Sequence, residues 1–293
     1  MRAGCIDIGS NTTRLLIADR VGSGLEAVHQ ERVFTRIGRG LIAGGTIPDE
    51  KIAEVVTVVA AQLASARELG VHELRGVATA AIRGAANGAQ LLAAIREATG
   101  LEVELLSREQ EARLAFRGAA AMLDTVDSAP ARSLGVLDVG GGSSEMVIGT
   151  APQQIEWWAS APLGSSSLTD QWLHSDPPSA AELAGARRHA VTILGELDPP
   201  RPSLVVAVGG SATSLCRLAG AVLDAGALVR ALRVLASQPS EVVARRSLID
   251  PQRARLLPAG LLILEAMAEL LASTITVGRG GIREGVVLEA MST

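Results

Sequence analysis

Short apolar runs, each followed by a polar turn containing glycine, mark two matching segments of the chain. The first run, Ala3 to Ile8, contains Asp7 and leads through Gly9-Ser10-Asn11-Thr12-Thr13 into another apolar run. The second segment, Leu134 to Gly149, has the same order of apolar run, Asp138, glycine turn and apolar run. β-Prone residues bounded by turn residues predict strand, turn and strand in both places. Two such hairpins indicate a duplicated architecture.

Between the hairpins, the pattern predicts alternating helices and strands. Apolar residues at helical spacing from Ile52 to Leu63 predict a helix after Pro48-Asp49, and Leu74 to Thr79 is predicted as a strand. A further strand is predicted over Val28 to Arg36. Arg83 stands just beyond the strand that ends at Thr79, where α/β proteins usually bind ligands. The alternation predicts an α/β fold.

The segment Ser107-Arg108-Glu109-Gln110 has the pattern of a capping box and predicts the start of a helix. The first turns of this helix carry Glu109 and Glu111. Acidic residues at a helix N-terminus complement the helix dipole, so either residue has an ordinary structural explanation. Glu111 has a functional role only if the tertiary structure directs its side chain to a phosphate site.

The second half of the chain repeats the alternation after a polar segment, Asp124 to Ser133, which predicts a loop and a domain boundary. A third glycine turn, Gly209-Gly210-Ser211, follows the apolar strand Leu204 to Val208. Such a turn at a helix start is either an anion site or a plain strand–helix junction. The sequence favours the two explanations equally.

The length of 293 residues is sufficient for one large domain or two ordinary ones. The hairpin repeat favours two: an N-terminal α/β domain over residues 1–123 and a C-terminal one over residues 124–282. The closing helix, residues 283–293, is expected to pack back on the first domain. The most apolar stretch, Leu256 to Leu271, contains two glutamates and predicts a buried helix, because a membrane span needs about 18 or more apolar residues.

Composition and charge limit the compartment and the partners that we expect. Asp7 interrupts the first apolar segment, so no signal peptide is predicted, and two cysteines are too few for a disulfide framework. We therefore expect a cytoplasmic protein without membrane association. The net charge of −4, the 2% aromatic content and the absence of tyrosine argue against general nucleic-acid binding.

The glycine turns carry the candidate chemistry. The run Gly140-Gly141-Gly142 lacks Cβ atoms, so a ligand can lie directly against backbone N–H groups, and Ser143 adds a hydroxyl donor. If the two halves of the chain face each other, the carboxylates of Asp7, Asp138 and Glu145 converge on a hydrated divalent cation, and the turns bind phosphate groups from two sides. This arrangement resembles the actin-like ATPase superfold shared by sugar kinases and heat-shock chaperone ATPases. The resemblance implies duplicated, ribonuclease-H-like domains with an interdomain cleft.

Four motifs, collinear and evenly spaced over the chain, make the resemblance more specific. They are DIGSN at Asp7 to Asn11, ATAAIR at Ala78 to Arg83, EARLAFRG at Glu111 to Gly118 and DVGGGSSE at Asp138 to Glu145. Together with GGSAT from Gly209 and GIREGVV near the C-terminus, they resemble the motif set of the exopolyphosphatase/guanosine pentaphosphate phosphohydrolase family. The chain resembles the short, two-domain members of that family.

The resemblance implies an exopolyphosphatase, in which an activated water hydrolyses the terminal phosphate of inorganic polyphosphate with Mg²⁺, or alternatively Mn²⁺, as cofactor. The catalytic base of the family corresponds to Glu111, and the candidate metal ligands are Asp7, Asp138 and Glu145. The residues expected to bind phosphate are Gly9, Ser10, Asn11, Arg83, Gly140, Gly141, Gly142, Ser143, Gly210 and Ser211. The expected partner is polyphosphate or guanosine pentaphosphate (pppGpp), and a homodimer is an open alternative for the oligomeric state.

Two positions beside Arg83 depart from the family pattern. Ala80 stands where serine is common, and Gly84 stands where aspartate is common, so the hydrogen bonding around Arg83 is expected to differ. Long members continue into an additional helical domain, and this chain stops at Thr293. Processivity on long chains is therefore not part of the expectation.

Three alternative functions remain at this point. The nearest is a pppGpp 5′-phosphohydrolase, because that substrate also presents a terminal phosphoanhydride; the few aromatic residues disfavour a guanine-stacking pocket. A more distant alternative is an actin-like ATP-binding protein or sugar kinase. The last is a polyphosphate or nucleotide sensor without catalysis, which would not need the full set of carboxylates.

Overall fold

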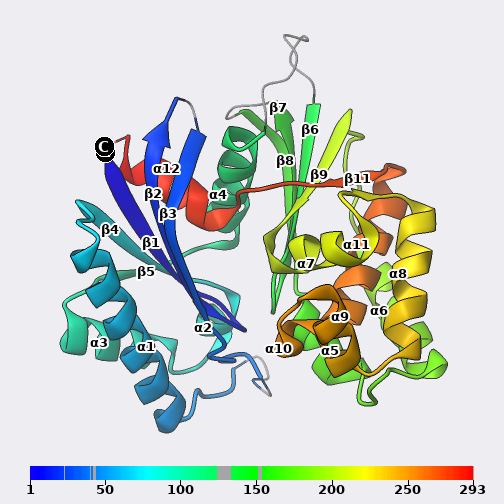
Figure 1. Cartoon of the computed structure of the whole chain (residues 1–293), viewed down its shortest axis with the longest axis horizontal. Helices are drawn as coiled ribbons and strands as arrows, with labels where there is room; N and C mark the ends of the chain where they lie inside the picture. The colour runs from blue at the N-terminus through cyan, green and yellow to red at the C-terminus, as the bar shows by residue number, and fades with distance from the viewer. Residues whose placement is uncertain (23, 40, 42–43, 124–132, 151–153, 293) are drawn as a thin grey trace. The chain divides into compact units, whose positions relative to one another are not determined.

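The computed structural model describes residues 1–22, 24–39, 41, 44–123, 133–150 and 154–292 (Figure 1). The chain forms two compact units. One comprises Met1–Met122 with Gly280–Thr293, and the other comprises Leu123–Arg279. Both are α/β in class, with one mixed sheet each.

The first unit is built on a five-stranded sheet of order β3-β2-β1-β4-β5. Pairs β1–β2 and β2–β3 are antiparallel, whereas β1–β4 and β4–β5 are parallel. The strands are β1 (Arg2–Ile8), β2 (Thr13–Val21), β3 (Gly24–Val33), β4 (Glu73–Ala78) and β5 (Val103–Leu105). The helices are α1 (Asp49–Glu68), α2 (Ala80–Gly84), α3 (Gly88–Thr99), α4 (Arg108–Ala121) and α12 (Ile282–Ala290).

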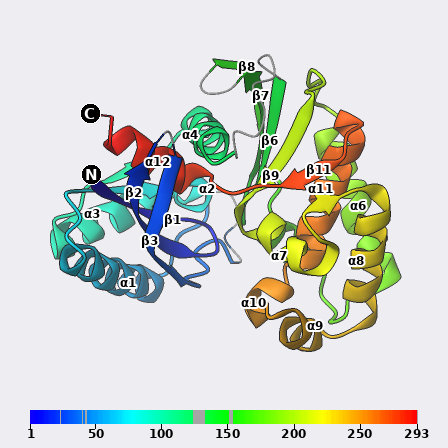
Figure 2. The same cartoon turned by 45° about the horizontal axis from the view of Figure 1, so that its top comes forward.

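Alternation of side chains along β1 divides the core of this unit into two layers. Ile6 and Ile8 belong to a cluster with residues of α1 and α3 on one face of the sheet. Cys5 faces the other way, into a cluster with residues of α4 and α12. Figures 1 and 2 show these helix pairs on opposite faces of the sheet. The closing helix α12 is therefore part of the first unit.

The second unit repeats this plan in a six-stranded sheet of order β10-β11-β9-β6-β7-β8. Its strands are β6 (Ser133–Val139), β7 (Ser144–Thr150), β8 (Gln154–Ala161), β9 (Leu204–Val208), β10 (Val222–Leu223) and β11 (Ile275–Val277). As in the first unit, an antiparallel meander of three strands continues through two parallel neighbours, here β9 and β11. This common order confirms the duplicated architecture that the two hairpins predicted.

Seven helices are described in the second unit: α5 (Ser165–Trp172), α6 (Ala180–Leu194), α7 (Gly209–Ala219), α8 (Ala225–Ser237), α9 (Ser240–Ser247), α10 (Pro251–Ala254) and α11 (Leu257–Leu271). Helix α11 is buried along most of its length, as its sequence predicted. The carboxylate of Glu265 on this helix is paired with Arg187 at 2.6 Å. In the described parts of the chain, no helix is both long and apolar enough to cross a membrane.

Some predicted boundaries were wrong. The strand predicted over Val28 to Arg36 runs from Gly24 to Val33, because its start is set by pairing with the long strand β2. Arg36 has φ of 50°, a left-handed conformation that a strand residue does not adopt. Helix α8 was not predicted; it begins at Asp224, whose carboxylate accepts a hydrogen bond from the N–H of Ala227 at 2.7 Å.

The start of α6 shows how one carboxylate orders a turn. Glu182 accepts hydrogen bonds from the backbone N–H groups of His174, Ser175 and Ser179 at 2.7, 2.9 and 2.6 Å, and from the Ser175 hydroxyl. The side chain of Ser179 caps the helix in return, so the capping box is complete. The hydrogen bond from the Ser175 hydroxyl, followed by those from Ser179 and the backbone, holds the pKa of Glu182 well below its usual value.

The depressed pKa of Glu182 predicts a pH-dependent contribution to stability. A carboxylate whose folded pKa is lowered stabilises the fold above its unfolded pKa, here about 4.5, and loses that contribution as the pH falls toward the folded pKa. We expect Glu182→Gln to lower the melting temperature at neutral pH, and the difference from wild type to shrink in acid. Thermal melts from neutral to acidic pH measure this, with the exposed Glu196→Gln as control. A difference that is constant with pH would contradict the prediction.

Candidate functional site

The turn between β1 and β2 is held by backbone hydrogen bonds. The N–H of Gly9 donates to the carbonyl of Thr12 at 2.9 Å. The carbonyl of Ser10 accepts from the N–H of Gly38 at 2.8 Å, and that of Asn11 accepts from Arg36 at 3.0 Å. The loop that carries Arg36 therefore lies against this turn and satisfies the carbonyl groups of Ser10 and Asn11.

Asp7 lies at the end of β1, opposite Arg14 in the strand register. Its Oδ1 atom is buried, and no hydrogen-bond donor reaches it from the residues that the structure describes. Burial raises the pKa of this carboxyl, and the nearby guanidinium groups of Arg283 and Arg14 oppose that rise. An acceptor oxygen without a donor suits a cation or a water molecule.

Arg83 and Glu111 meet at the edge of the first sheet. Arg83 lies in α2, directly after β4, and Glu111 lies in the first turns of α4, soon after the parallel neighbour β5. Because parallel strands end at the same edge, both side chains reach one place. The Nη1 atom of Arg83 donates to Glu111 Oε1 and, at 2.7 Å, to the carbonyl of Leu106. Only 2% of Glu111 is exposed, so a buried carboxylate stands against a guanidinium group.

Close contact between backbones fixes α4 against α12. A Cβ atom on Gly118 would lie 2.0 Å from the carbonyl oxygen of Gly281, and one on Gly285 would lie 2.2 Å from that of Leu114. Only glycine permits such an approach. Since Gly118 is two helical turns beyond Glu111, the contact places the helix that carries Glu111.

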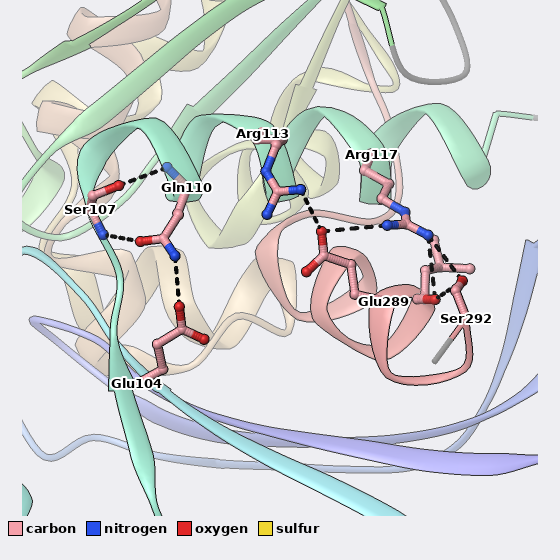
Figure 3. Close-up of polar contacts among 8 residues, drawn as sticks. Glu104, Ser107, Gln110, Arg113, Arg117, Glu289 and Ser292 are labelled. Carbon is pink, nitrogen blue, oxygen red and sulfur yellow. Dashed lines mark hydrogen bonds and ion pairs between the residues drawn. The ribbon is translucent and has the colours of Figure 1, made fainter.

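Polar contacts at both ends of α4 add to this packing (Figure 3). Glu289 on α12 forms ion pairs with Arg113 at 2.9 Å and with Arg117 at 3.4 Å. At the other end, the predicted capping box is confirmed, with Ser107 and Gln110 bonded to each other's backbone N–H groups. The start of α4, and with it Glu111, is held at a defined position.

In the second unit, Asp138 and Glu145 are direct register partners on β6 and β7. Side chains of such partners share one face of the sheet, so the two carboxylates stand close together. Asp138 is 9% exposed and Glu145 is 2% exposed. Glu145 also accepts a hydrogen bond from the Ser160 hydroxyl at 2.9 Å. Buried carboxylates require hydrogen bonds or positive charge nearby, and carboxylate oxygens are ligands that divalent cations accept.

The glycine turn between β6 and β7 is covered on its carbonyl side by α5. The N–H groups of Ser165 and Ser166 donate to the carbonyls of Gly140 and Gly141, both at 2.9 Å. A Cβ atom on Gly164 would lie 2.3 Å from the Gly141 carbonyl oxygen, so this contact requires glycine. Within the described ranges, no acceptor receives the N–H of Gly141 or Gly142, which leaves these donors for an anion.

The third glycine turn, Gly209-Gly210-Ser211, lies against the strand that carries Asp138. Gly209 has φ of 82°, and a Cβ atom there would lie 2.4 Å from Asp138 Oδ1. The Ser211 hydroxyl donates to the carbonyl of Val139 at 3.3 Å. The start of α7 therefore packs directly on the strand that carries Asp138.

Arg253 was not found by sequence reasoning, although its position is informative. It lies in the short helix α10 and is 6% exposed. Its Nη2 atom would lie 2.6 Å from a Cβ atom on Gly210, at the start of α7. A cation at a helix N-terminus opposes the helix dipole, so this placement suits a site that also holds an anion. The sequence signal near Arg253 is the helix-start pattern Asp250-Pro251 just before it. This pattern does not show that Arg253 packs on Gly210.

The predicted site residues thus fall into two sets. The first unit holds Asp7, Gly9, Ser10, Asn11, Arg83 and Glu111, and the second holds Asp138, Gly140, Gly141, Gly142, Ser143, Glu145, Gly210 and Ser211. Among the residues with described positions, no three His, Cys, Asp or Glu side chains form a group that could hold a metal ion. Any cation would therefore draw on fewer protein ligands, with water and phosphate oxygens completing its shell.

Two α/β units of common topology, with glycine turns and carboxylates at their strand ends, define a protein of the actin-like superfold. Comparison of the sequence with protein families specifies this further. The model of the Ppx/GppA phosphatase family matches residues 16–293, and the chain belongs to this family.

Individual proteins of this family are similar to the chain in sequence and in structure. The chain is 30% identical to Exopolyphosphatase 1 of Mycobacterium leprae, covering 100% of this chain and 90% of the relative. It is also 30% identical to Exopolyphosphatase 2 of Mycobacterium tuberculosis, covering 98% of both chains. The solved structure of the Aquifex aeolicus Ppx/GppA family member superposes with a TM-score of 0.82 at 28% identity, over 100% of this chain and 98% of that one.

The contact between α4 and α12 generates a stability prediction. In Gly118→Ala, the new methyl group would overlap the Gly281 carbonyl, and we expect a loss of about 1–3 kcal/mol or more in the free energy of unfolding. Denaturant unfolding measures this loss. Gly84→Ala is the matched control, because its Cβ would meet no atom within 4 Å. Equal stability of the two variants would contradict the proposed packing.

Proposed function

We propose that this chain is an exopolyphosphatase that hydrolyses the terminal phosphate of inorganic polyphosphate by means of a water molecule activated by Glu111. Membership of the Ppx/GppA phosphatase family and two relatives named exopolyphosphatase support this assignment. The single observation that carries it is the ion pair between the buried Glu111 and the partly exposed Arg83 at the strand ends of the first sheet.

Glu111 is suited to the role of general base. Its carboxylate is shielded from solvent, and its helix is fixed by the glycine contact with α12. In the proposed reaction, Glu111 takes the proton from the attacking water, the bond between the terminal phosphorus and the bridging oxygen breaks, and the shortened chain leaves as an anion. The ion pair with the Arg83 guanidinium orients this carboxylate.

Arg83 and the glycine turns are the proposed phosphate-binding groups. Phosphoryl transfer depends mainly on positioning and on stabilisation of charge at the phosphate oxygens. The N–H groups of Gly141 and Gly142 and the guanidinium of Arg83 provide donors of this kind, and the buried Arg253 adds another. The turns at Gly9-Ser10-Asn11 and Gly210-Ser211 are proposed to contribute further contacts.

We assign metal binding to Asp7, Asp138 and Glu145. The donor set consists of carboxylate oxygens, which Mg²⁺ prefers, and Mn²⁺ accepts the same ligands. In the first unit the orphaned Asp7 Oδ1, and in the second unit the facing carboxylates of Asp138 and Glu145, are each suited to supply oxygen ligands, with water and phosphate oxygens completing the shell. When bound, the ion would neutralise charge on the phosphate oxygens.

The second candidate is hydrolysis of pppGpp, a substrate that the family also implies. The two substrates share the terminal phosphoanhydride, and the site described above contacts only that part. The low aromatic content, 2%, favours polyphosphate over a nucleotide that needs stacking.

Replacement of the proposed base tests the mechanism directly. We expect Glu111→Gln to lower kcat on polyphosphate by about 10²–10⁴-fold, because the amide cannot accept the proton of the attacking water. Glu109→Gln, an exposed neighbour in the same helix turn, is the control and should retain wild-type activity. Release of orthophosphate is measured with Mg²⁺ present. Full activity of Glu111→Gln would remove Glu111 from the mechanism.

The metal assignment generates a second prediction. Asp138→Asn removes one of two facing carboxylates, so we expect the Mg²⁺ concentration for half-maximal activity to rise by about tenfold or more. Titration of activity with Mg²⁺ and with Mn²⁺ measures this shift. The exposed Glu156→Gln on β8 is the matched control. An unchanged metal requirement in Asp138→Asn would contradict the assignment.

Side-by-side turnover decides between the two substrates. We expect kcat/KM to be higher for polyphosphate than for pppGpp, because no aromatic platform favours the guanine base. The opposite ratio would establish the second candidate as the function.

A further inference from the structure

Exposed arginines gather around the three helices α7, α9 and α10 of the second unit. Arg217 lies on α7, and Arg245 and Arg246 lie in the last turn of α9. All three are exposed, and in the described part of the chain none of them forms an ion pair with a carboxylate. We refer to Arg217, Arg245 and Arg246 as the arginine surface.

The local sequence is strongly basic in a chain of net charge −4. Residues 245–255 contain four arginines and a single acidic residue, Asp250. The carboxylate of Asp250 is engaged in capping α10, where it accepts from the N–H groups of Gln252 and Arg253 at 2.9 and 3.4 Å. Asp250 keeps its negative charge in this role and Glu241 on α9 adds another, so the four arginines of residues 240–255 leave a net charge of +2 in this segment.

Specific contacts bring the members of this surface together. The guanidinium of Arg217 donates to the carbonyl of Leu248, just beyond the end of α9. Leu248 has φ of 53° and turns the chain sharply between α9 and α10, and the N–H of Ile249 closes the turn on the Ala244 carbonyl at 3.0 Å. Arg246 donates to the side chain of Gln238 at 3.0 Å. Figures 1 and 2 show α9 and α10 side by side, near α7.

The arginine surface is continuous with the third glycine turn. Arg253, which belongs to α10, packs its guanidinium on Gly210 at the start of α7. Gly210 and Arg217 are seven positions apart on α7, so they share one face of the helix and lie about 10 Å apart along its axis. The glycine turn, on which the buried Arg253 packs, and the exposed Arg217 thus belong to the same stretch of α7, and α9 and α10 lie beside that helix.

We propose that the arginine surface binds the distal phosphates of a polyphosphate chain whose terminal phosphate is held at the glycine turns. The inference rests on the proposed function, because it concerns the remainder of the same substrate. Arginine suits this task, since its planar guanidinium binds phosphate oxygens through two parallel hydrogen bonds and stays charged at any physiological pH. The surface makes the protein selective for chains longer than the few phosphates that the turns contact.

The double variant Arg245→Ser/Arg246→Ser tests the proposal, because both side chains are exposed and neither contacts the glycine turns. We expect KM for long-chain polyphosphate to rise about three- to tenfold more than KM for tripolyphosphate. The salt dependence of long-chain binding should become shallower, as fewer counterions are released. The matched control is Arg230→Ser/Arg233→Ser on the exposed face of α8, which removes the same charge elsewhere in the unit.

Equilibrium binding of fluorescently labelled long-chain polyphosphate separates this inference from the proposed function, because it needs no turnover. Weaker binding in the double variant alone supports the arginine surface even if hydrolysis proves absent. Equal effects on tripolyphosphate and long chains, or an equal effect in the α8 control, would overturn it. An equally large loss of binding to a single-stranded oligodeoxynucleotide of matched charge would also overturn it, by showing a general polyanion surface. Thermal melts of all variants confirm that they are folded.

Discussion

The structure depends on a steric constraint: at several points backbone must touch backbone or a carboxylate, and a Cβ atom would prevent it. Gly118 permits α4 to lie against α12, Gly164 permits α5 to cover the second hairpin turn, and Gly209 permits α7 to start against Asp138. Each contact fixes an element that carries a candidate site residue. Rigid elements hold functional groups more precisely than loops do, so these glycines determine how well the site is preorganised.

Buried carboxylates are the second constraint, and their neighbours differ between the two units. In the first, the carboxylate of Glu111 faces the guanidinium of Arg83, and Arg283 and Arg14 only partly offset the rise that burial causes in the pKa of Asp7. In the second, Asp138 and Glu145 face each other. Two neighbouring buried carboxylates are costly unless hydrogen bonds or positive charge stabilise them, and the Ser160 hydroxyl donates one such hydrogen bond to Glu145.

Much of the fold followed from the sequence. The two hairpins, the helix capped by Ser107 and the buried helix α11 each depend on local patterns, because turn residues, capping side chains and apolar spacing act over a few positions. Boundaries that depend on distant partners were less predictable. Strand β3 starts where β2 offers a partner. The omission of α8 has no such reason, because Asp224 is a capping residue and Leu228, Ala231 and Leu235 fall at helical spacing.

The sequence by itself determined the duplicated plan and the types of residue available at the strand ends, since glycine runs and carboxylates are visible in the order of the chain. It could not decide which of the two acids at the start of α4 is buried. Tertiary structure alone turned Glu111 toward Arg83 and left Glu109 exposed, because that choice depends on α12 and on the parallel pairing of β4 with β5. Likewise, Arg253 became a candidate site residue only when α10 packed on the start of α7, a contact between segments about 40 residues apart that no local pattern records.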